Sequence, residues 1–237
     1  FLSSISLMSM LGVAIGVAVL IVVLSVMNGF ERELRERILS MTSHATVTTF
    51  GAGLQRWPAL RDRALGNPAV EAVAAYVEGE ALLIGERSDG VPAAVALRGI
   101  DPALEAQVSG IEARLRSGSL EKLEPGSYRM LLGAEVAARL GVEAGDTVVA
   151  AIAQGTVTPA GVVPRMRRFT VAGIFYSGMY EIDNGLALVN LGDAGRLFRT
   201  GEDVSGLRLK VRDPLRAPSV AREVARDMDG GFLVEDW

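Results

Sequence analysis

Cysteine is absent from this 237-residue sequence, histidine occurs once, as His44, and lysine occurs twice, as Lys122 and Lys210. Without cysteine and with a single histidine, the chain has no Cys/His zinc site and no disulfide framework. Neither lysine stands in the Gly-x-x-x-x-Gly-Lys-Ser/Thr pattern, which excludes the phosphate-binding loop that many nucleotide hydrolases use. We therefore expect no thiol chemistry, no zinc site of this kind and no ATP hydrolysis by that loop in this chain.

The charge balance is slightly acidic, with 24 basic and 28 acidic residues and a net charge of -4. The arginines are dispersed along the chain, whereas nucleic-acid binding requires concentrated cationic surface. We therefore expect no nucleic-acid partner.

Catalytic groupings are also missing from the sequence. No Gly-x-Ser-x-Gly pattern accompanies His44, so a hydrolytic triad is not indicated, and we interpret this residue as a surface or packing residue. The carboxylates of Glu181 and Asp183 are interpreted as solvated surface groups. The prediction is a chain with no catalytic residue, no metal ligand and no cofactor of its own.

A long apolar run opens the chain, and the first charged residue is Glu31. The 23 residues Ile5–Met27 carry no charge and would form a helix of about 35 Å, enough to cross a hydrocarbon core roughly 30 Å thick. A cleaved signal peptide is the alternative, but its apolar region is normally about 7–15 residues long. We predict a membrane-spanning helix in residues 1–29.

The segment after the span has helical periodicity. Phe30, Leu34, Ile38 and Met41 recur on one face, and Glu31 can pair with a residue four positions later. We predict that the helix continues as an amphipathic stalk over residues 30–44, the alternative being a solvated helix end without a further task.

Residues 45–237 have the alternating short strands and helices of an α+β domain. Pro68 opens a segment, 68–75, that we interpret as a helix, and Asp101 followed by Pro102 predicts a helix start. Gly141 predicts the end of a helix over 134–140. Further helices are predicted over 57–65 and 217–227, and strands over 46–50, 80–84, 93–98, 147–152, 168–174, 186–190, 204–212 and 232–234.

The connection over residues 153–167 is longer than compact domains usually allow, since most connections take about 2–6 residues. It contains Pro159 and Pro164 and has no charge before Arg165. We interpret it as a protruding hairpin arm that offers backbone and apolar side chains to a partner. The alternative is a surface loop without a partner.

One stretch of the sequence resembles a known family. Residues 11–34, and most specifically SVMNGFEREL at 25–34, resemble the first membrane helix and stalk of the lipoprotein-releasing system transmembrane permeases, the LolC/LolE family within the MacB/FtsX-like ABC permease superfamily. The likeness continues through the whole chain, at 98–102, 124–126, 132–133, 140–142 and 145–146.

The resemblance implies a MacB-like periplasmic core, here the α+β domain, attached to one N-terminal transmembrane helix and stalk. It places the chain in the bacterial inner membrane with its main domain in the periplasm, and a second membrane helix would follow Trp237 in a longer permease. The implied partners are a second permease subunit, a cytoplasmic ATPase subunit that holds ATP and Mg, lipoprotein cargo and the periplasmic lipoprotein chaperone LolA. The chain itself would be a non-catalytic permease subunit.

The resemblance also implies site residues. A chaperone-binding hook matches Gln154, Gly155, Thr156, Val157, Thr158, Pro159, Ala160, Gly161, Val162, Val163 and Pro164. A basic pad matches Arg167, with Arg165 and Arg168 beside it. Lipoprotein contacts are expected at Met27, Phe30, Leu34 and Met41.

One departure from the family pattern is that 147–152, the strand entering the hook, has no basic residue. A chaperone-recruiting subunit, a LolE-like partner subunit and a single permease with both roles therefore stay open at this point. Two other interpretations also remain: a MacB-type exporter permease, and a membrane-anchored periplasmic scaffold or binding domain.

Overall fold

The computed structural model describes residues 2–39, 44–49, 53–86, 90–158, 161–228 and 232–236. The chain divides into two compact units, residues 1–40 and 41–237. The first unit is one long helix, α1 (Leu2–Leu39), and we call the second unit the body. Within α1, residues Ser6–Phe30 are long and apolar enough to cross a membrane, in agreement with the predicted span.

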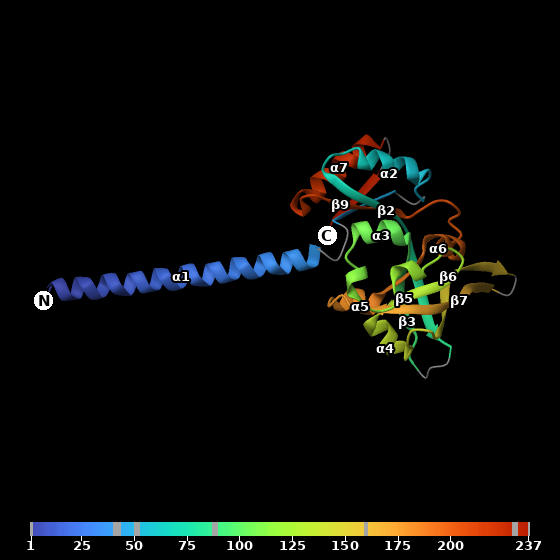
Figure 1. Cartoon of the computed structure of the whole chain (residues 1–237), viewed down its shortest axis with the longest axis horizontal. Coiled ribbons are helices and arrows are strands. Elements are labelled where there is room, and N and C mark those ends of the chain that lie inside the picture. Colours follow the sequence, from blue (N-terminus) through green and yellow to red (C-terminus); the bar gives the residue numbers. More distant parts are fainter. Residues whose placement is uncertain are drawn as a thin grey trace. The chain divides into compact units, whose positions relative to one another are not determined.

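The body is built from strands with helices packed on them (Figure 1). Its strands are β1 (Ala45–Thr49), β2 (Val70–Gly85), β3 (Ala93–Ile100), β4 (Leu115–Ser117), β5 (Arg129–Gly133), β6 (Thr147–Thr158), β7 (Gly161–Phe175), β8 (Leu186–Asn190), β9 (Gly206–Val211) and β10 (Phe232–Asp236). Its helices are α2 (Trp57–Leu65), α3 (Pro102–Val108), α4 (Ala134–Leu140), α5 (Tyr180–Gly185), α6 (Leu191–Phe198) and α7 (Ala217–Asp227), with short 3-10 turns η1 (Glu112–Arg114), η2 (Leu120–Lys122) and η3 (Pro214–Arg216). This mixed content confirms the predicted α+β class.

The strands form one sheet in the order β10-β1-β9-β2-β3-β8-β5-β7-β4, and β6 joins β7 to β2. The pairs β2·β3, β3·β8, β8·β5, β5·β7, β7·β6 and β6·β2 thereby close a ring of strands. The largest buried cluster includes Leu83, Leu97, Leu132 and Phe169 from these strands and Leu197 from α6. A second cluster around Leu131, Phe175 and Leu188 packs on the other side of the same strands, so β5, β7 and β8 are buried on both faces.

Several local predictions are confirmed. Asp101 caps α3, because its side chain accepts hydrogen bonds from the backbone N–H groups of Ala103 (2.9 Å) and Leu104 (3.3 Å). Gly141 ends α4 in the left-handed conformation, with φ of 63°. The strands predicted over 80–84 and 93–98 pair as the antiparallel hairpin β2–β3.

The helix predicted over 68–75 is wrong, because residues from Val70 onward belong to strand β2. Val73 and Ala75 face the main core, whereas Ala72 and Ala74 pack under α3 on the opposite face. A strand that is covered on both faces does not alternate apolar and polar residues. Without that alternation, the sequence pattern of this segment does not distinguish a strand from a helix.

One polar residue, Asp183, differs from expectation, whereas the burial of His44 agrees with its interpretation as a packing residue. Asp183, expected to be solvated, is buried, and its carboxylate accepts hydrogen bonds from the N–H groups of Ser177 (2.6 Å) and Gly178 (3.0 Å). His44, at the end of the expected stalk, is buried in the body, where the N–H of Val211 donates to its Nδ1. Both side chains satisfy backbone groups that burial removes from water.

Candidate functional site

Strands β6 and β7 extend beyond the rest of the sheet as a two-stranded hairpin, which we call the arm (Figure 1). The pairs Thr156↔Val163, Val157↔Val162 and Thr158↔Gly161 continue the ladder to its tip. The segment interpreted from the sequence as a hairpin arm over 153–167 is thus mostly β-ladder, and the strands run further than the sequence indicated. Pro159 and Ala160 lie outside the described residues, as do the side chains of the other residues from 154 to 163.

A change of register marks the base of the arm. β6 pairs with β2 only as far as Leu82↔Ala151, and the β6–β7 register shifts between Ile152 and Thr156. Such bulges bend a strand and increase its twist. Beyond Ala151, β6 therefore leaves β2, and the arm continues as a separate ribbon.

The three arginines expected to form a basic pad have different environments. Arg165 is half-buried, and its guanidinium donates a hydrogen bond of 3.1 Å to the carbonyl of Leu197 at the end of α6. Arg167 is exposed, and its guanidinium lies over the ring of Tyr128, 4.6 Å from the ring centroid. Arg168 is exposed on the other face of β7 and forms an ion pair of 2.7 Å with Glu86.

These environments give the arginines different chemical roles. Arg167 presents a cation that the aromatic face of Tyr128 orients while leaving it open to solvent. Arg168 is partly neutralised by a surface carboxylate, and an exposed pair of this kind is weak. The accessible positive charge at the base of the arm thus comes from Arg167 and Arg168, whereas Arg165 is occupied within the body.

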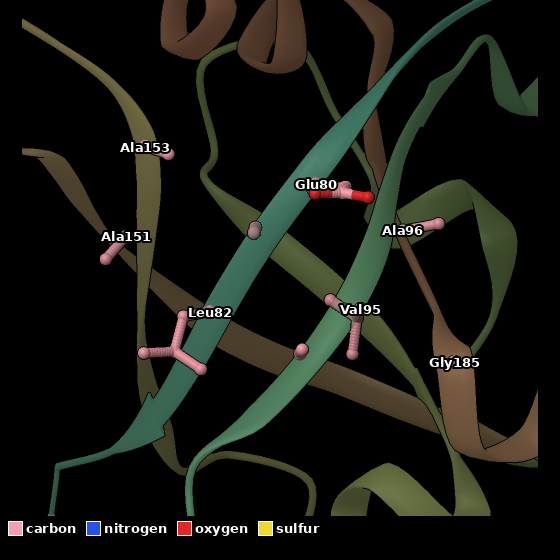
Figure 2. A pocket seen from close by; sticks show the side chains of 9 residues that line it. Glu80, Leu82, Val95, Ala96, Ala151, Ala153 and Gly185 are labelled. Carbon is pink, nitrogen blue, oxygen red and sulfur yellow. The ribbon is translucent and has the colours of Figure 1, made fainter.

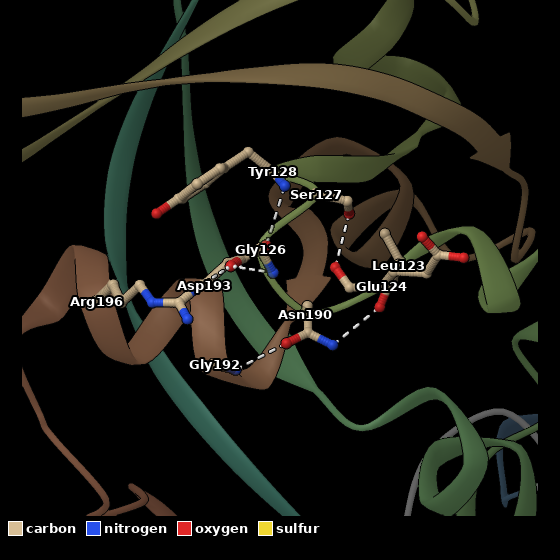
Figure 3. A network of polar contacts seen from close by, with 9 residues as sticks. All are labelled: Leu123, Glu124, Gly126, Ser127, Tyr128, Asn190, Gly192, Asp193 and Arg196. Carbon is tan, nitrogen blue, oxygen red and sulfur yellow. Dashed lines mark hydrogen bonds and ion pairs between the residues drawn. The ribbon is translucent and has the colours of Figure 1, made fainter.

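A network of polar contacts holds Tyr128 in place (Figure 3). The fully buried carboxylate of Asp193 accepts hydrogen bonds from the backbone N–H groups of Gly126 (2.9 Å) and Tyr128 (3.0 Å), and Arg196 pairs with it at 2.9 Å. The ring of Tyr128 then packs edge-on against Phe169, at 5.8 Å between centroids.

A second polar residue fastens the same loop to α6. The side-chain N–H of Asn190 donates a hydrogen bond to the carbonyl of Leu123 (2.9 Å). The side-chain oxygen of Asn190 accepts a hydrogen bond from the N–H of Gly192 (2.9 Å), and this contact caps the start of α6. The network therefore links α6 to the loop that carries Tyr128 and so to the position of Arg167. Sequence reasoning missed these residues, although the Asn190-x-Gly192 start of a helix was a usable signal.

A groove of about 480 Å³ lies beside the arm base, across the outer faces of β2, β3 and β6 (Figure 2). Its lining consists of Glu80, Ala81, Leu82, Ala94, Val95, Ala96, Ala151, Ala153 and Gly185. Glu80 is the one ionisable residue among them. A shallow floor of small side chains with a single carboxylate lacks the converging polar groups of a catalytic pocket.

The expected lipoprotein contacts lie mostly on α1. Met27 is 67% exposed and Phe30 is 65% exposed within this unit. The side chain of Leu34 and the whole of Met41 lie outside the described residues. In the residues that the structure describes, no group of three or more His, Cys, Asp or Glu side chains is arranged to hold a metal ion.

Comparison with known proteins supports the resemblance seen in the sequence. The family model described as MacB-like periplasmic core domain matches residues 6–227. The chain is 46% identical over its full length to the lipoprotein-releasing system transmembrane protein LolC of Xylella fastidiosa (strain 9a5c) and covers 56% of that protein. It is 39% identical over its full length to the LolC protein of Neisseria meningitidis serogroup B, covering 57% of it. The chain thus spans just over half the length of these curated relatives.

The fold has solved counterparts. The extracellular domain of the noncanonic ABC-type transporter YknZ from Gram-positive bacteria superimposes with a TM-score of 0.52 and 14% identity, over 81% of this chain and all of that one. At such identity the likeness concerns the fold. Together with the family match over almost the entire chain, it shows that this chain belongs to the family of MacB-like periplasmic core domains.

Proposed function

We propose that the chain is part of the permease subunit of an ABC transporter that releases lipoproteins from the inner membrane and passes them to a periplasmic chaperone. The observation that carries this proposal is the similarity of the whole chain to just over half the length of two proteins named LolC, at 46% and 39% identity. In this proposal α1 anchors the chain in the inner membrane, the body is periplasmic, and a cytoplasmic ATPase subunit supplies ATP hydrolysis with Mg. A second permease subunit completes the membrane part.

The arm is proposed as the chaperone-binding hook, with Arg167 and Arg168 as its basic pad. An antiparallel ribbon that leaves the sheet offers unpaired edge groups to a partner, as in β-augmentation. Exposed arginines beside it favour an acidic partner surface and speed its association. Because Arg165 donates to Leu197, the proposed pad is limited to the other two arginines.

The experiment that tests this proposal measures binding of the lipoprotein chaperone LolA to the whole chain in lipid nanodiscs. One variant replaces 154–164 with a two-glycine turn, a second carries Arg167→Glu, and Arg212→Glu serves as the matched control. Arg212 is exposed and follows Val211, which pairs with Val70 at the end of β2 opposite to its pairing with β6 at Leu82, so its reversal changes the net charge equally away from the proposed pad.

We expect the arm replacement to abolish binding and Arg167→Glu to weaken it at least tenfold, with the control unchanged. Equal weakening by the Arg212 control would mean that only net charge matters, which contradicts a specific pad. No binding by the unmodified chain would favour a LolE-like partner subunit, a MacB-type exporter or a membrane-anchored scaffold.

Lipoprotein contact is proposed at the end of α1, where apolar side chains follow the candidate span. A photo-crosslinker at Phe30, which is exposed within α1, should capture lipoprotein when the chain is expressed with its ATPase subunit. The same crosslinker at Glu223, an exposed residue of α7, is the control. Capture at both positions, or at neither, would contradict a specific contact at Phe30.

A further inference from the structure

We infer that Arg165 is a positioning residue that fixes the direction of the arm, and this inference deepens the function proposed above. Its guanidinium Nη1 donates a hydrogen bond of 3.1 Å to the carbonyl of Leu197. Leu197 belongs to the last turn of α6, where carbonyl groups have no partner within the helix. The cation is therefore placed at the negative end of the helix, where a basic side chain is favoured.

The location of Arg165 makes this contact important for the arm. Arg165 pairs with Ile152, the last β6 residue before the register shift, and β6 has already left β2 after Ala151. A two-stranded hairpin by itself is only marginally stable in water, so contacts at its base are needed to hold it. The Arg165 side chain ties this base to the body outside the β-ladder, because it donates a hydrogen bond to the end of α6.

The burial of Arg165 supports a structural role. Its Nε is inaccessible to solvent and has no hydrogen-bond partner in the structure, so burying this guanidinium carries a desolvation cost. A side chain that only provided surface charge would extend into solvent, as Arg168 does at 74% exposure. The hydrogen bond to Leu197 offsets part of that cost, and this ties the arm base to α6.

A connected path therefore runs from α6 to both parts of the proposed docking surface. Leu197 holds the arm through Arg165, and Asp193, one turn earlier in α6, holds Tyr128 beneath Arg167. One rigid helix, α6, thus fixes the position of the proposed hook relative to the guanidinium of Arg167. Preorganisation of this kind increases affinity by reducing the ordering cost of binding.

The test uses Arg165→Met, which retains the length of the side chain but removes its donors, and Arg165→Lys, which retains a donor and the charge. Arg212→Met is the control for loss of a positive charge away from the arm. The chain has no cysteine, so Val157→Cys on the arm and Glu223→Cys on α7 accept two spin labels uniquely. Pulsed electron–electron double resonance then measures the distribution of distances between the two spin labels in the whole chain in nanodiscs. Chaperone affinity is measured in parallel on unlabelled protein.

We expect Arg165→Met to broaden the distance distribution at least twofold and to weaken chaperone binding about tenfold, a change of 1.4 kcal/mol. Arg165→Lys should recover part of both effects, and Arg212→Met should change neither. The melting temperature should fall by only about 2–4 °C, as expected for one hydrogen bond in a domain of this size, so unfolding would not explain the result.

An unchanged distance distribution in Arg165→Met would overturn the inference, even if chaperone binding were weaker, because Arg165 would then act by direct contact. A broadened distribution with unchanged chaperone affinity would support the positioning role and contradict the proposed hook. The two failures are therefore distinguishable.

Discussion

Arg208 on β9 and Glu105 on α3 form an ion pair of 2.5 Å, with side chains only 6% and 3% exposed. The pair fastens α3 to the outer face of the sheet, next to the two buried alanines Ala72 and Ala74. Burial alone raises the pKa of Glu105, but the charge of Arg208, hydrogen bonds from Ser109 and Arg208, and the charge of Arg98 outweigh it, so the net pKa is lowered. Glu105 is therefore an ionised carboxylate inside the body.

Glu105→Gln should lower the free energy of unfolding by about 3–5 kcal/mol, since it removes the negative charge that compensates a buried guanidinium. Urea denaturation followed by circular dichroism measures this. Glu86→Gln is the control, because the Glu86–Arg168 pair is exposed and should contribute no more than about 1 kcal/mol. Equal effects of the two substitutions would contradict the importance of burial.

Stability should also decrease in acid because of Glu105. A carboxyl group whose pKa is lower in the folded chain than its ordinary value of 4.5 stabilises the fold at higher pH. That stabilisation is fully present above the unfolded pKa and is lost as the pH falls through the folded pKa. The urea concentration at the denaturation midpoint is measured from pH 7 downward. In the unmodified chain this midpoint should decrease once the pH is below about 4.5, and in Glu105→Gln it should decrease less steeply. Parallel curves for the two proteins would exclude Glu105 as a source of the dependence.

Asp193→Ala should destabilise the body by about 3 kcal/mol, because the backbone N–H groups of Gly126 and Tyr128 would lose a charged acceptor. Arg196→Met removes only the cation, whose side chain is 58% exposed, and should cost less than about 1 kcal/mol. The comparison separates the backbone-holding role of the carboxylate from its ion pair. If both variants lost the same stability, the ion pair would be the main contribution.

Under the proposed function, Tyr128→Ala should weaken chaperone binding through Arg167, since it removes the ring that orients this guanidinium. Tyr128→Phe retains the ring and should leave affinity within about twofold, a difference smaller than 1 kcal/mol. Calorimetric titration of both variants with the chaperone checks this, and their melting curves identify any loss through unfolding. A large effect of Tyr128→Phe would indicate that the hydroxyl, rather than the ring, contacts the partner.

Gly173→Ala should destabilise the body by at least about 2 kcal/mol, because an added Cβ would lie 2.1 Å from the carbonyl oxygen of Ser117. This close approach joins β7 to the short strand β4. Gly185→Ala is the control, since nothing lies within 4 Å of the position of its Cβ. Thermal unfolding of the two variants measures the difference, and similar melting temperatures would contradict the close approach.

Local sequence patterns were sufficient to predict those features that depend on contacts between residues close together in the sequence. The uncharged run at the start predicts α1 from length and hydropathy alone. Asp101 and Gly141 indicate the start of α3 and the end of α4, because capping depends on groups within one turn. The length and prolines of 153–167 indicate a hairpin arm for the same local reason.

Contacts between residues far apart in the sequence decided the features that the sequence patterns did not predict. Segment 70–75 became a strand because α3 and the main core cover its two faces. Asp183 and Asp193 became buried acceptors because folding brought backbone N–H groups to them, the latter from more than sixty residues away. Likewise, three neighbouring arginines of one strand received three different environments, from α6, Tyr128 and Glu86. The sequence by itself determined the long apolar helix, the α+β class and the arm. Only the tertiary structure decided which charges remain available on the surface, because burial and long-range hydrogen bonds are set by elements far apart in the chain.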